Sequence, residues 1–140
     1  MSLSYLLDTN VLSEPAKPTP NPGVQQRLLE AEGSIATASL VWHELWFGCH
    51  RLPESRRRAA LETYLRDVIA PHVPVLGYED AAASWHASEQ ARLTASGKTP
   101  SFVDGQIAAI ARVHALVLVT ANVRHYEGFE GLTVEDWRSR

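Results

Sequence analysis

Short apolar runs alternate along the chain with longer stretches in which apolar residues recur at helical spacing. The short runs predict strands at residues 5–7, 35–38, 73–76, 117–120 and 132–134. The helical spacing predicts a single turn over residues 12–16 and helices over residues 24–32, 39–49, 55–68, 80–96 and 102–114. Strand–helix alternation of this kind is typical of an α/β fold, in which helices cover both faces of a parallel sheet.

The length of 140 residues matches one domain, which we expect to span residues 1–140. Cys49 is the only cysteine, so an intrachain disulfide and the cysteine-pair zinc motifs are excluded. The first residues lack the basic segment of a signal peptide, and no apolar run approaches the roughly 20 residues of a membrane helix. We therefore expect a cytoplasmic protein that does not associate with membranes.

The chain carries 13 Lys and Arg residues and 16 Asp and Glu residues, for a formal net charge of −3. This balance argues against a basic surface for tight, sequence-independent nucleic-acid binding. It does not exclude a nucleic-acid enzyme, because a cluster of carboxylates that holds cations would itself lower the net charge. The positions of the acidic residues are therefore more informative than the total.

Asp8 ends the first predicted strand, within the sequence LLDTN of residues 6–10. An Asp at this position can form an Asx turn or cap a following helix. It can also project into the crevice at the carboxyl end of the strand, where parallel sheets bind ligands. Asp104 has two similar interpretations, because Ser101 and Asp104 have the spacing of a capping box at the start of a helix.

Glu44 lies in a predicted helix with Ser39 at its N-cap and the nearly uniformly apolar sequence LVWHELWF at residues 40–47. Such a helix is expected to be buried or to lie against a partner. An ionised carboxylate in these surroundings is costly unless it is paired, binds a cation or changes its pKa. Glu44 is thus a candidate metal ligand; the alternative is a side chain that reaches solvent or pairs with an arginine.

The three acidic residues gain significance together, because each is predicted to lie at the same edge of the sheet. Converging carboxylates repel one another, and a cation would neutralise them. Oxygen ligands alone favour magnesium or manganese over zinc. Such an ion can polarise a phosphoryl oxygen and lower the pKa of a bound water. The sequence therefore predicts a site for Mg²⁺ or Mn²⁺ that contains Asp8, Glu44 and Asp104.

Four segments follow one another in a recognisable order: LLDTNVLSEP at residues 6–15, the helix of residues 39–48, DGQIAAIA at residues 104–111 and LVTAN at residues 118–122. Together they resemble the PIN-domain ribonucleases, particularly the FitB-like branch of the VapC toxins from bacterial toxin–antitoxin pairs. The resemblance extends from about residue 4 to residue 137. It implies a PIN-like α/β/α sandwich around a mainly parallel sheet of four to five strands.

The resemblance also implies a metal-dependent endoribonuclease with Asp8, Glu44 and Asp104 as metal ligands. Asp8 and Asp104 would hold the ion, with Glu44 binding directly or through water. An activated water would attack the RNA phosphodiester and leave 5′-phosphate and 3′-hydroxyl ends. Thr9 and Thr120 would orient a carboxylate or the attacking water. Asn10 would brace the turn.

In the family, a fourth acidic residue often occupies the position that is Asn122 here. An amide supplies no charge, although its carbonyl oxygen can still contact a metal ion or a bound water. The substitution therefore predicts weaker binding of a second ion. It also raises the alternative of a catalytically weakened PIN-like domain that binds protein or RNA without cutting.

Other features concern partners. The basic run Arg56, Arg57 and Arg58 is either a solvated helix face or a contact surface for RNA phosphates, and Arg124 is a further candidate. The aromatic residues of the helix at 39–49 belong to the core or form a partner surface. The resemblance implies an antitoxin partner, a homodimer and a larger assembly of the two.

Three competing nucleotide- or phosphate-related folds lack their signatures in this sequence. A phosphoacceptor receiver domain needs a second acid beside Asp8 and a lysine near the end of a late strand, and residues 117–122 contain no lysine. Neither the Rossmann nor the P-loop glycine pattern occurs.

Overall fold

The computed structural model describes residues 2–139, which form a central sheet of five short strands. The strands are β1 (Tyr5–Leu7), β2 (Ile35–Ala38), β3 (Val75–Leu76), β4 (Val117–Val119) and β5 (Val134–Glu135). Their order across the sheet is β3-β2-β1-β4-β5, and every neighbouring pair is parallel. The predicted mainly parallel sheet of four to five strands is confirmed.

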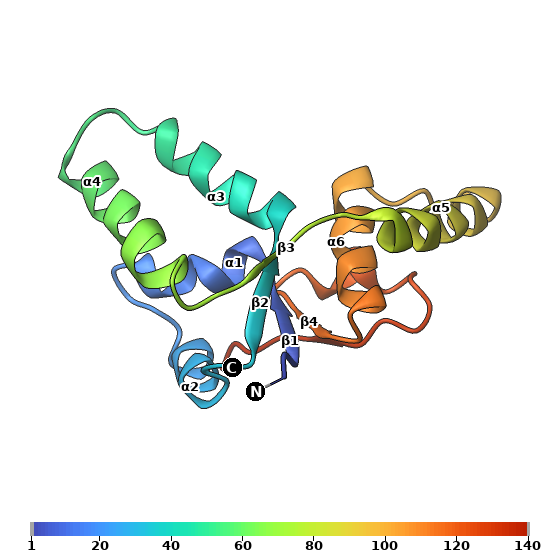
Figure 1. Ribbon diagram of the computed structural model, residues 1–140, viewed down its shortest axis with the longest axis horizontal. Coiled ribbons are helices and arrows are strands. Elements are labelled where there is room, and N and C mark those ends of the chain that lie inside the picture. The colour runs from blue at the N-terminus through green and yellow to red at the C-terminus, as the bar shows by residue number, and fades with distance from the viewer. Residues whose placement is uncertain (1, 140) are drawn as a thin grey trace.

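Helices cover the sheet on both sides (Figure 1). They are α1 (Thr9–Leu12), α2 (Pro22–Glu30), α3 (Ser39–His50), α4 (Arg56–Thr63), α5 (Asp80–Ala95) and α6 (Phe102–Val113), with the short turns η1 (Glu14–Ala16), η2 (Tyr64–Ile69) and η3 (Val123–Tyr126). In Figure 1, α1, α2 and α4 lie to one side of the strands and α5 and α6 to the other. Within residues 2–139, no helix combines the length and apolar character needed to cross a membrane.

The register of the central strands brings their carboxyl ends to one level. Leu7 at the end of β1 lies opposite Thr37 of β2 and Val119 of β4. Residues that directly follow these strands are therefore neighbours in space, although they are far apart in sequence. The Asp8 backbone N–H donates to the Val119 carbonyl at 3.0 Å, which continues the β1–β4 pairing by one residue.

Two helices begin earlier than the hydrophobic spacing predicts, because local caps determine their starts. Asp8 caps α1, so the first turn begins at Thr9 instead of residue 12. Asn21 Oδ1 accepts hydrogen bonds from the backbone N–H groups of Gly23 and Val24, which starts α2 at Pro22. Proline suits this first helical position because the N–H it lacks would have no partner within the helix.

The predicted N-cap at Ser39 is wrong, because the chain passes from β2 directly into α3 and Ala38 occupies the cap position. The predicted helix at residues 55–68 is α4 followed by the π-helical turn η2, with the Ser55 hydroxyl accepting from the Arg58 N–H. The last strand lies slightly later than residues 132–134, since Val134 is the residue that pairs with Leu118.

Helices α5 and α6 pack closely at Gly105, directly after Asp104. A Cβ atom on Gly105 would lie only 2.1 Å from Nε2 of the buried His86 on α5. Only glycine permits this close approach of the two helices. The contact fixes the height of the first turn of α6 relative to α5, and hence the place of Asp104.

Candidate active site at the carboxyl edge of the sheet

Asp8 is buried at the carboxyl end of the central strand β1, and both of its oxygens have partners. Oδ1 accepts a hydrogen bond from the Thr9 backbone N–H at 2.8 Å, and Oδ2 accepts one from the Thr120 hydroxyl at 2.8 Å. The capping role and the sheet-edge position therefore occur in the same side chain. The hydroxyl of Thr120 fixes the orientation of the carboxylate across two strands.

The environment of Asp8 is unfavourable for a charged carboxylate. Burial raises the pKa of Asp8, and the nearby carboxylates of Glu44 and Asp104 raise it further, while the hydrogen bonds from Thr120 and Thr9 oppose this change. The structure thus brings together Asp8 directly after β1, Glu44 of α3 and Asp104 of α6. We call these three side chains the acidic cluster.

Glu44 is exposed on α3, which agrees with the alternative of a side chain that reaches solvent. Trp42 and Trp46 are half-buried, and Phe47 is exposed. Glu44 accepts a hydrogen bond from the Thr9 hydroxyl. It forms no ion pair with an arginine or lysine of residues 2–139. Thr9 therefore connects two members of the cluster: its backbone N–H donates to Asp8 and its hydroxyl to Glu44.

Asp104 lies in the first turn of α6, which is capped as its sequence predicts. The Asp104 N–H donates to the Ser101 hydroxyl at 3.2 Å, which leaves the Asp104 carboxylate directed elsewhere. Oδ1 accepts from the Tyr126 hydroxyl at 3.3 Å, and Oδ2 lies 3.4 Å from His125 Nδ1. The Ser101 cap is therefore formed, but the Asp104 carboxylate accepts no capping bond from the Ser101 N–H and contacts Tyr126 and His125 instead.

Tyr126 was not predicted as part of the site. It lies on η3, is almost completely buried, and its ring packs beside Phe129. Burial and the surrounding carboxylates of Asp8, Asp104 and Glu44 raise the pKa of its hydroxyl. The available signal was an aromatic residue with a polar tip shortly after a strand end, because a buried tyrosine hydroxyl needs a partner.

The remaining polar residues form a rim around the cluster. The Asn10 carboxamide holds the end of β4: its Oδ1 accepts from the Ala121 N–H at 2.9 Å, and its Nδ2 donates to the Thr120 hydroxyl at 3.4 Å. Asn10 thus braces a turn, although that turn is the one after β4. Asn122 is exposed; its backbone N–H donates to Thr120 Oγ1 at 3.0 Å, and its amide side chain has no hydrogen bond within residues 2–139.

The arginines of the basic run lie on α4, on the opposite side of the sheet from α6 in Figure 1. Arg58 is held by Glu62 at 2.9 Å and by the Leu52 carbonyl at 3.1 Å, so it stabilises the α3–α4 connection. Arg56 and Arg57 are exposed. Arg124, in contrast, lies on η3 beside His125, close to the cluster.

The donor atoms of the acidic cluster are oxygens, which suits a hard divalent cation. Among residues 2–139, the contact of His125 with Asp104 is the one ion pair that involves a member of the cluster. As the side chains lie, no group of three His, Cys, Asp or Glu residues in this range is arranged to hold a metal ion. The carboxylate oxygens of Asp8, Glu44 and Asp104 are nevertheless of the chemical type that such an ion prefers.

A parallel sheet covered on both faces, with carboxylates at its carboxyl edge that lack lysine or arginine partners, defines an α/β protein with an acidic sheet-edge site. The sequence model of the PIN domain matches residues 5–128. The chain belongs to the PIN-domain family, whose ribonucleases generally depend on a divalent metal ion.

Relatives of known sequence and structure agree with this assignment. The chain is 32% identical to the tRNA(fMet)-specific endonuclease VapC of Shigella flexneri, over 96% of this chain and 98% of the relative. The crystal structure of FitAcB from Neisseria gonorrhoeae superposes with a TM-score of 0.85 at 28% identity, covering 93% of this chain and 95% of the other. DNA-bound VapBC from Salmonella typhimurium gives a TM-score of 0.83 at 27% identity, covering 96% and 98%.

Proposed function

We propose that the protein is a magnesium- or manganese-dependent endoribonuclease and the toxin component of a toxin–antitoxin pair, with residues 1–140 forming one PIN domain. The observation that carries this proposal is the acidic cluster. Asp8, Glu44 and Asp104 come from three separate segments, and their mutual repulsion and burial raise the pKa of Asp8. Such an arrangement is costly for a structural site and useful for one that binds a cation.

Each residue of the site has a distinct task in this proposal. Asp8 and Asp104 hold the cation, and Glu44 completes the site directly or through water. When bound, the cation supplies the Lewis acidity that activates a water molecule and offsets charge on the phosphate. The Thr120 hydroxyl holds Asp8 in one orientation, and Thr9 does so for Glu44. Asn10 keeps the end of β4 in place.

Asn122 lies where the resemblance leads us to expect a fourth acid. Its exposed amide is available to a water or an ion at the rim of the site, but it adds no negative charge. We therefore propose one tightly bound cation and weak binding of any second one. Arg124 at this rim contacts RNA phosphate, and Arg56 and Arg57 on α4 provide more distant contacts.

We infer the partners of this protein from the structures that it resembles and from the aromatic side chains on α3. The similar structures are of FitAcB and of VapBC. We propose that this protein likewise binds an antitoxin. We also propose a homodimer, which would associate into a larger assembly with the antitoxin. The half-buried Trp42 and Trp46 and the exposed Phe47 give α3 an aromatic surface suited to either contact. The single cysteine is consistent with action in the cytoplasm.

The direct test is cleavage of structured RNAs by the purified protein in magnesium, by the same protein in EDTA, and by Asp8→Asn in magnesium. Asparagine caps a helix as well as aspartate does, so the variant should fold. Loss of several kcal/mol of charge stabilisation predicts a rate lower by about 100-fold or more in EDTA and in the variant. The products should carry 5′-phosphate and 3′-hydroxyl ends. Equal cleavage in all three samples would exclude the proposed mechanism.

A second candidate function is a domain that binds RNA or protein without cutting. The neutral Asn122 favours it, because an amide adds no negative charge to the site. Calorimetric titration with magnesium separates the two functions. Binding of magnesium by the wild type and its loss in Asp8→Asn support the nuclease. RNA binding without magnesium binding or cleavage supports the alternative.

A further inference from the structure

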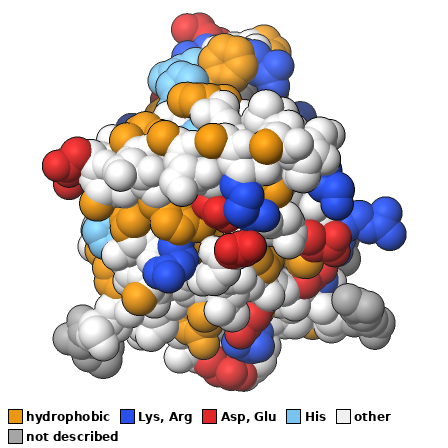
Figure 2. Space-filling view, turned by 90° about the vertical axis from the view of Figure 1, so that its right-hand side faces the viewer, with side chains coloured by type: hydrophobic (Ala, Val, Ile, Leu, Met, Phe, Trp, Pro, Cys, Tyr) orange, Lys and Arg blue, Asp and Glu red, His pale blue; other side chains and the backbone are white. Residues whose placement is uncertain are grey.

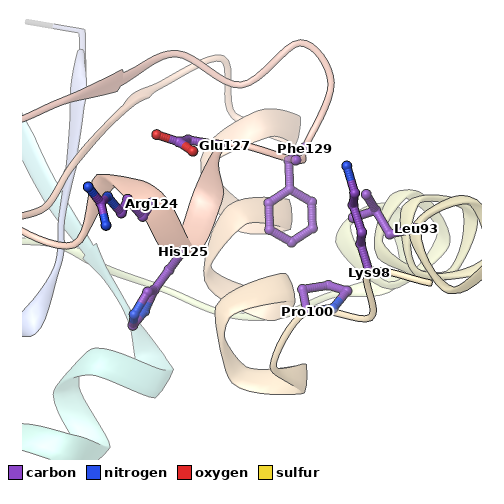
Figure 3. A pocket seen from close by; sticks show the side chains of 8 residues that line it. Leu93, Lys98, Pro100, Arg124, His125, Glu127 and Phe129 are labelled. Carbon is purple, nitrogen blue, oxygen red and sulfur yellow. The ribbon is translucent and has the colours of Figure 1, made fainter. Parts of the chain in front are cut away.

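A cavity of about 370 Å³ lies between the end of α5, the loop before α6, and η3 with the segment that follows it (Figure 3). Its lining includes Leu93, Lys98, Pro100, Arg124, His125 and Phe129. In Figure 3, Lys98 and Arg124 lie on opposite sides of Phe129. Segments from two parts of the chain thus build one pocket whose lining combines apolar and charged side chains.

The charge of this pocket is unusual for the molecule. Lys98, Arg124 and His125 line it against a single acid, Glu127, in a chain with net charge −3. The side chains of Lys98 and Arg124 form no hydrogen bond or ion pair with other residues of the described range 2–139. Figure 2, which views the molecule from the side of α5 and α6, shows basic and acidic side chains interspersed over that face. The two unpaired cations are therefore available to an external anion.

The apolar wall of the cavity is fixed in place. Phe129 is buried and packs beside Trp85 and Tyr126, with ring centroids 5.9 Å and 6.3 Å away. Leu93 is buried as well, and Pro100 is conformationally restricted. A preformed apolar wall beside two cations suits a ligand with a flat or sugar-like body and a phosphate group.

The cavity adjoins the acidic cluster through His125. This side chain lines the cavity, and its Nδ1 lies 3.4 Å from Asp104 Oδ2. Arg124 precedes it, and Tyr126, which donates to Asp104, follows it. A strand whose phosphate lies at the acidic cluster would therefore place its neighbouring nucleotide at the mouth of this cavity.

We propose that the cavity binds one nucleotide of the RNA strand next to the cleaved phosphodiester. Arg124, beside the acidic cluster, contacts the phosphate on the near side of that nucleotide, and Lys98, on the other side of Phe129, contacts the phosphate on its far side. Pro100 and Phe129 contact its sugar or base. The volume lies near the lower end of the range for small-molecule pockets, which fits one nucleotide of a single strand. This inference rests on the proposed nuclease function and assigns the part of the substrate that the site holds beside the scissile bond.

The test compares wild type with Lys98→Met/Arg124→Met, which keeps the aliphatic stems and removes both charges. The matched control, Arg66→Met/Arg112→Met, removes two exposed charges outside the cavity. A fluorescent single-stranded RNA is titrated against each protein in EDTA over a range of salt concentrations. The cavity variant should bind at least about 10-fold more weakly at low salt. Its log–log salt slope should fall by about 0.7 for each phosphate that the variant no longer neutralises. The control should match wild type in both.

Two further measurements separate this inference from the proposed function. Titration with 5′-AMP should shift the NMR signals of Gly128 and Phe129 in wild type and not in the cavity variant, and inorganic phosphate alone should shift them less. With cleavable RNA, the cavity variant should raise KM several-fold more than it lowers kcat. Wild-type cleavage with an unchanged KM and salt slope in the variant would overturn the inference and leave the nuclease intact. Absence of wild-type cleavage despite 5′-AMP binding would overturn the proposed function instead.

A third outcome concerns proteins. If the cavity variant binds RNA as wild type does but loses affinity for the antitoxin, the two cations serve an acidic segment of that partner. That result would also overturn the assignment to a nucleotide.

Discussion

Three carboxylates of this protein are buried to nearly the same extent, yet their surroundings differ. Asp8, Glu14 and Glu89 are 7%, 5% and 7% exposed. Glu14 accepts from Lys17 and from the Asn21 N–H, both at 2.9 Å, and these contacts lower its pKa. Glu89 accepts two hydrogen bonds from Arg92 at 2.9 Å and one from the Glu130 N–H at 2.8 Å, and its pKa is lowered as well.

Asp8 has no cationic partner within residues 2–139; its charged neighbours are Glu44 and Asp104. Glu14 and Glu89 stabilise the fold, because each buried charge is compensated by an opposite charge and by backbone donors. The charge of Asp8 is compensated by hydrogen bonds alone. Among the buried carboxylates, the one whose charge the fold leaves unbalanced is thus the one that is free to attract a cation.

The largest effect on stability is expected at Glu89. Glu89→Gln keeps an acceptor for the Glu130 N–H but removes the charge that holds Arg92. Loss of two charge-assisted hydrogen bonds should lower the free energy of unfolding by about 2 kcal/mol. Urea denaturation measures this value, and RNA cleavage per folded molecule should be unchanged. If the variant were as stable as wild type, the Glu89–Arg92 contact would be no more than a surface ion pair.

The opposite sign is expected at Asp8. In EDTA, Asp8→Asn removes the repulsion with Glu44 and Asp104 while an amide oxygen still caps α1. We expect an increase of about 0.5–1 kcal/mol in the free energy of unfolding. Magnesium should stabilise wild type and not the variant, so the difference should shrink or reverse as magnesium is added. A variant that is less stable than wild type in EDTA would show that the Thr120 hydrogen bond outweighs the repulsion.

The two regions should also respond to pH in opposite directions. The raised pKa of Asp8 means that its penalty is present at neutral pH and is relieved as pH falls through the folded-state pKa, above the ordinary value of 3.8. The lowered pKa of Glu89 means that its contribution persists down to about its ordinary value of 4.5 and is lost below it. Denaturation between pH 7 and pH 4 in EDTA should therefore narrow the gap between wild type and Asp8→Asn. The gap between wild type and Glu89→Gln should stay constant until about pH 4.5, and parallel changes would contradict this contrast.

The position of Asp8 was predictable because it depends on simple rules. Parallel strands end at one edge, and an Asp after the central strand must lie there. The first turn of α6 is capped by Ser101 as its sequence predicts, and the fold places Asp104 within electrostatic reach of Asp8. The α/β class followed from the alternation of the two hydrophobic periods, which does not depend on the detailed packing.

Other features depend on contacts between segments that no local pattern encodes. The exposure of Glu44 depends on how much of the apolar helix α3 the rest of the chain covers. Glu89 becomes buried because the segment after η3 folds back onto α5 and offers the Glu130 N–H. His125 and Tyr126 reach Asp104 because the chain turns sharply after β4, and the direction of a side chain in such a turn follows from tertiary packing.

The smallest expected effect is at Tyr126. It compares a tyrosine hydroxyl that contacts the acidic cluster with one that only stabilises the fold. Tyr126→Phe keeps the buried ring and removes the hydrogen bond to Asp104. Tyr64→Phe is the matched control, because the Tyr64 hydroxyl donates to the Leu12 carbonyl at 2.7 Å, and burial raises its pKa to about 12.

Removal of the hydrogen bond to Leu12 should lower the free energy of unfolding by about 1 kcal/mol and leave magnesium affinity unchanged. Removal of the hydrogen bond to Asp104 should weaken magnesium binding by about threefold, since the freed carboxylate must be ordered when the cation binds. Calorimetry without RNA measures both affinities, and equal affinities in the two variants would mean that Tyr126 only fills space behind the acidic cluster.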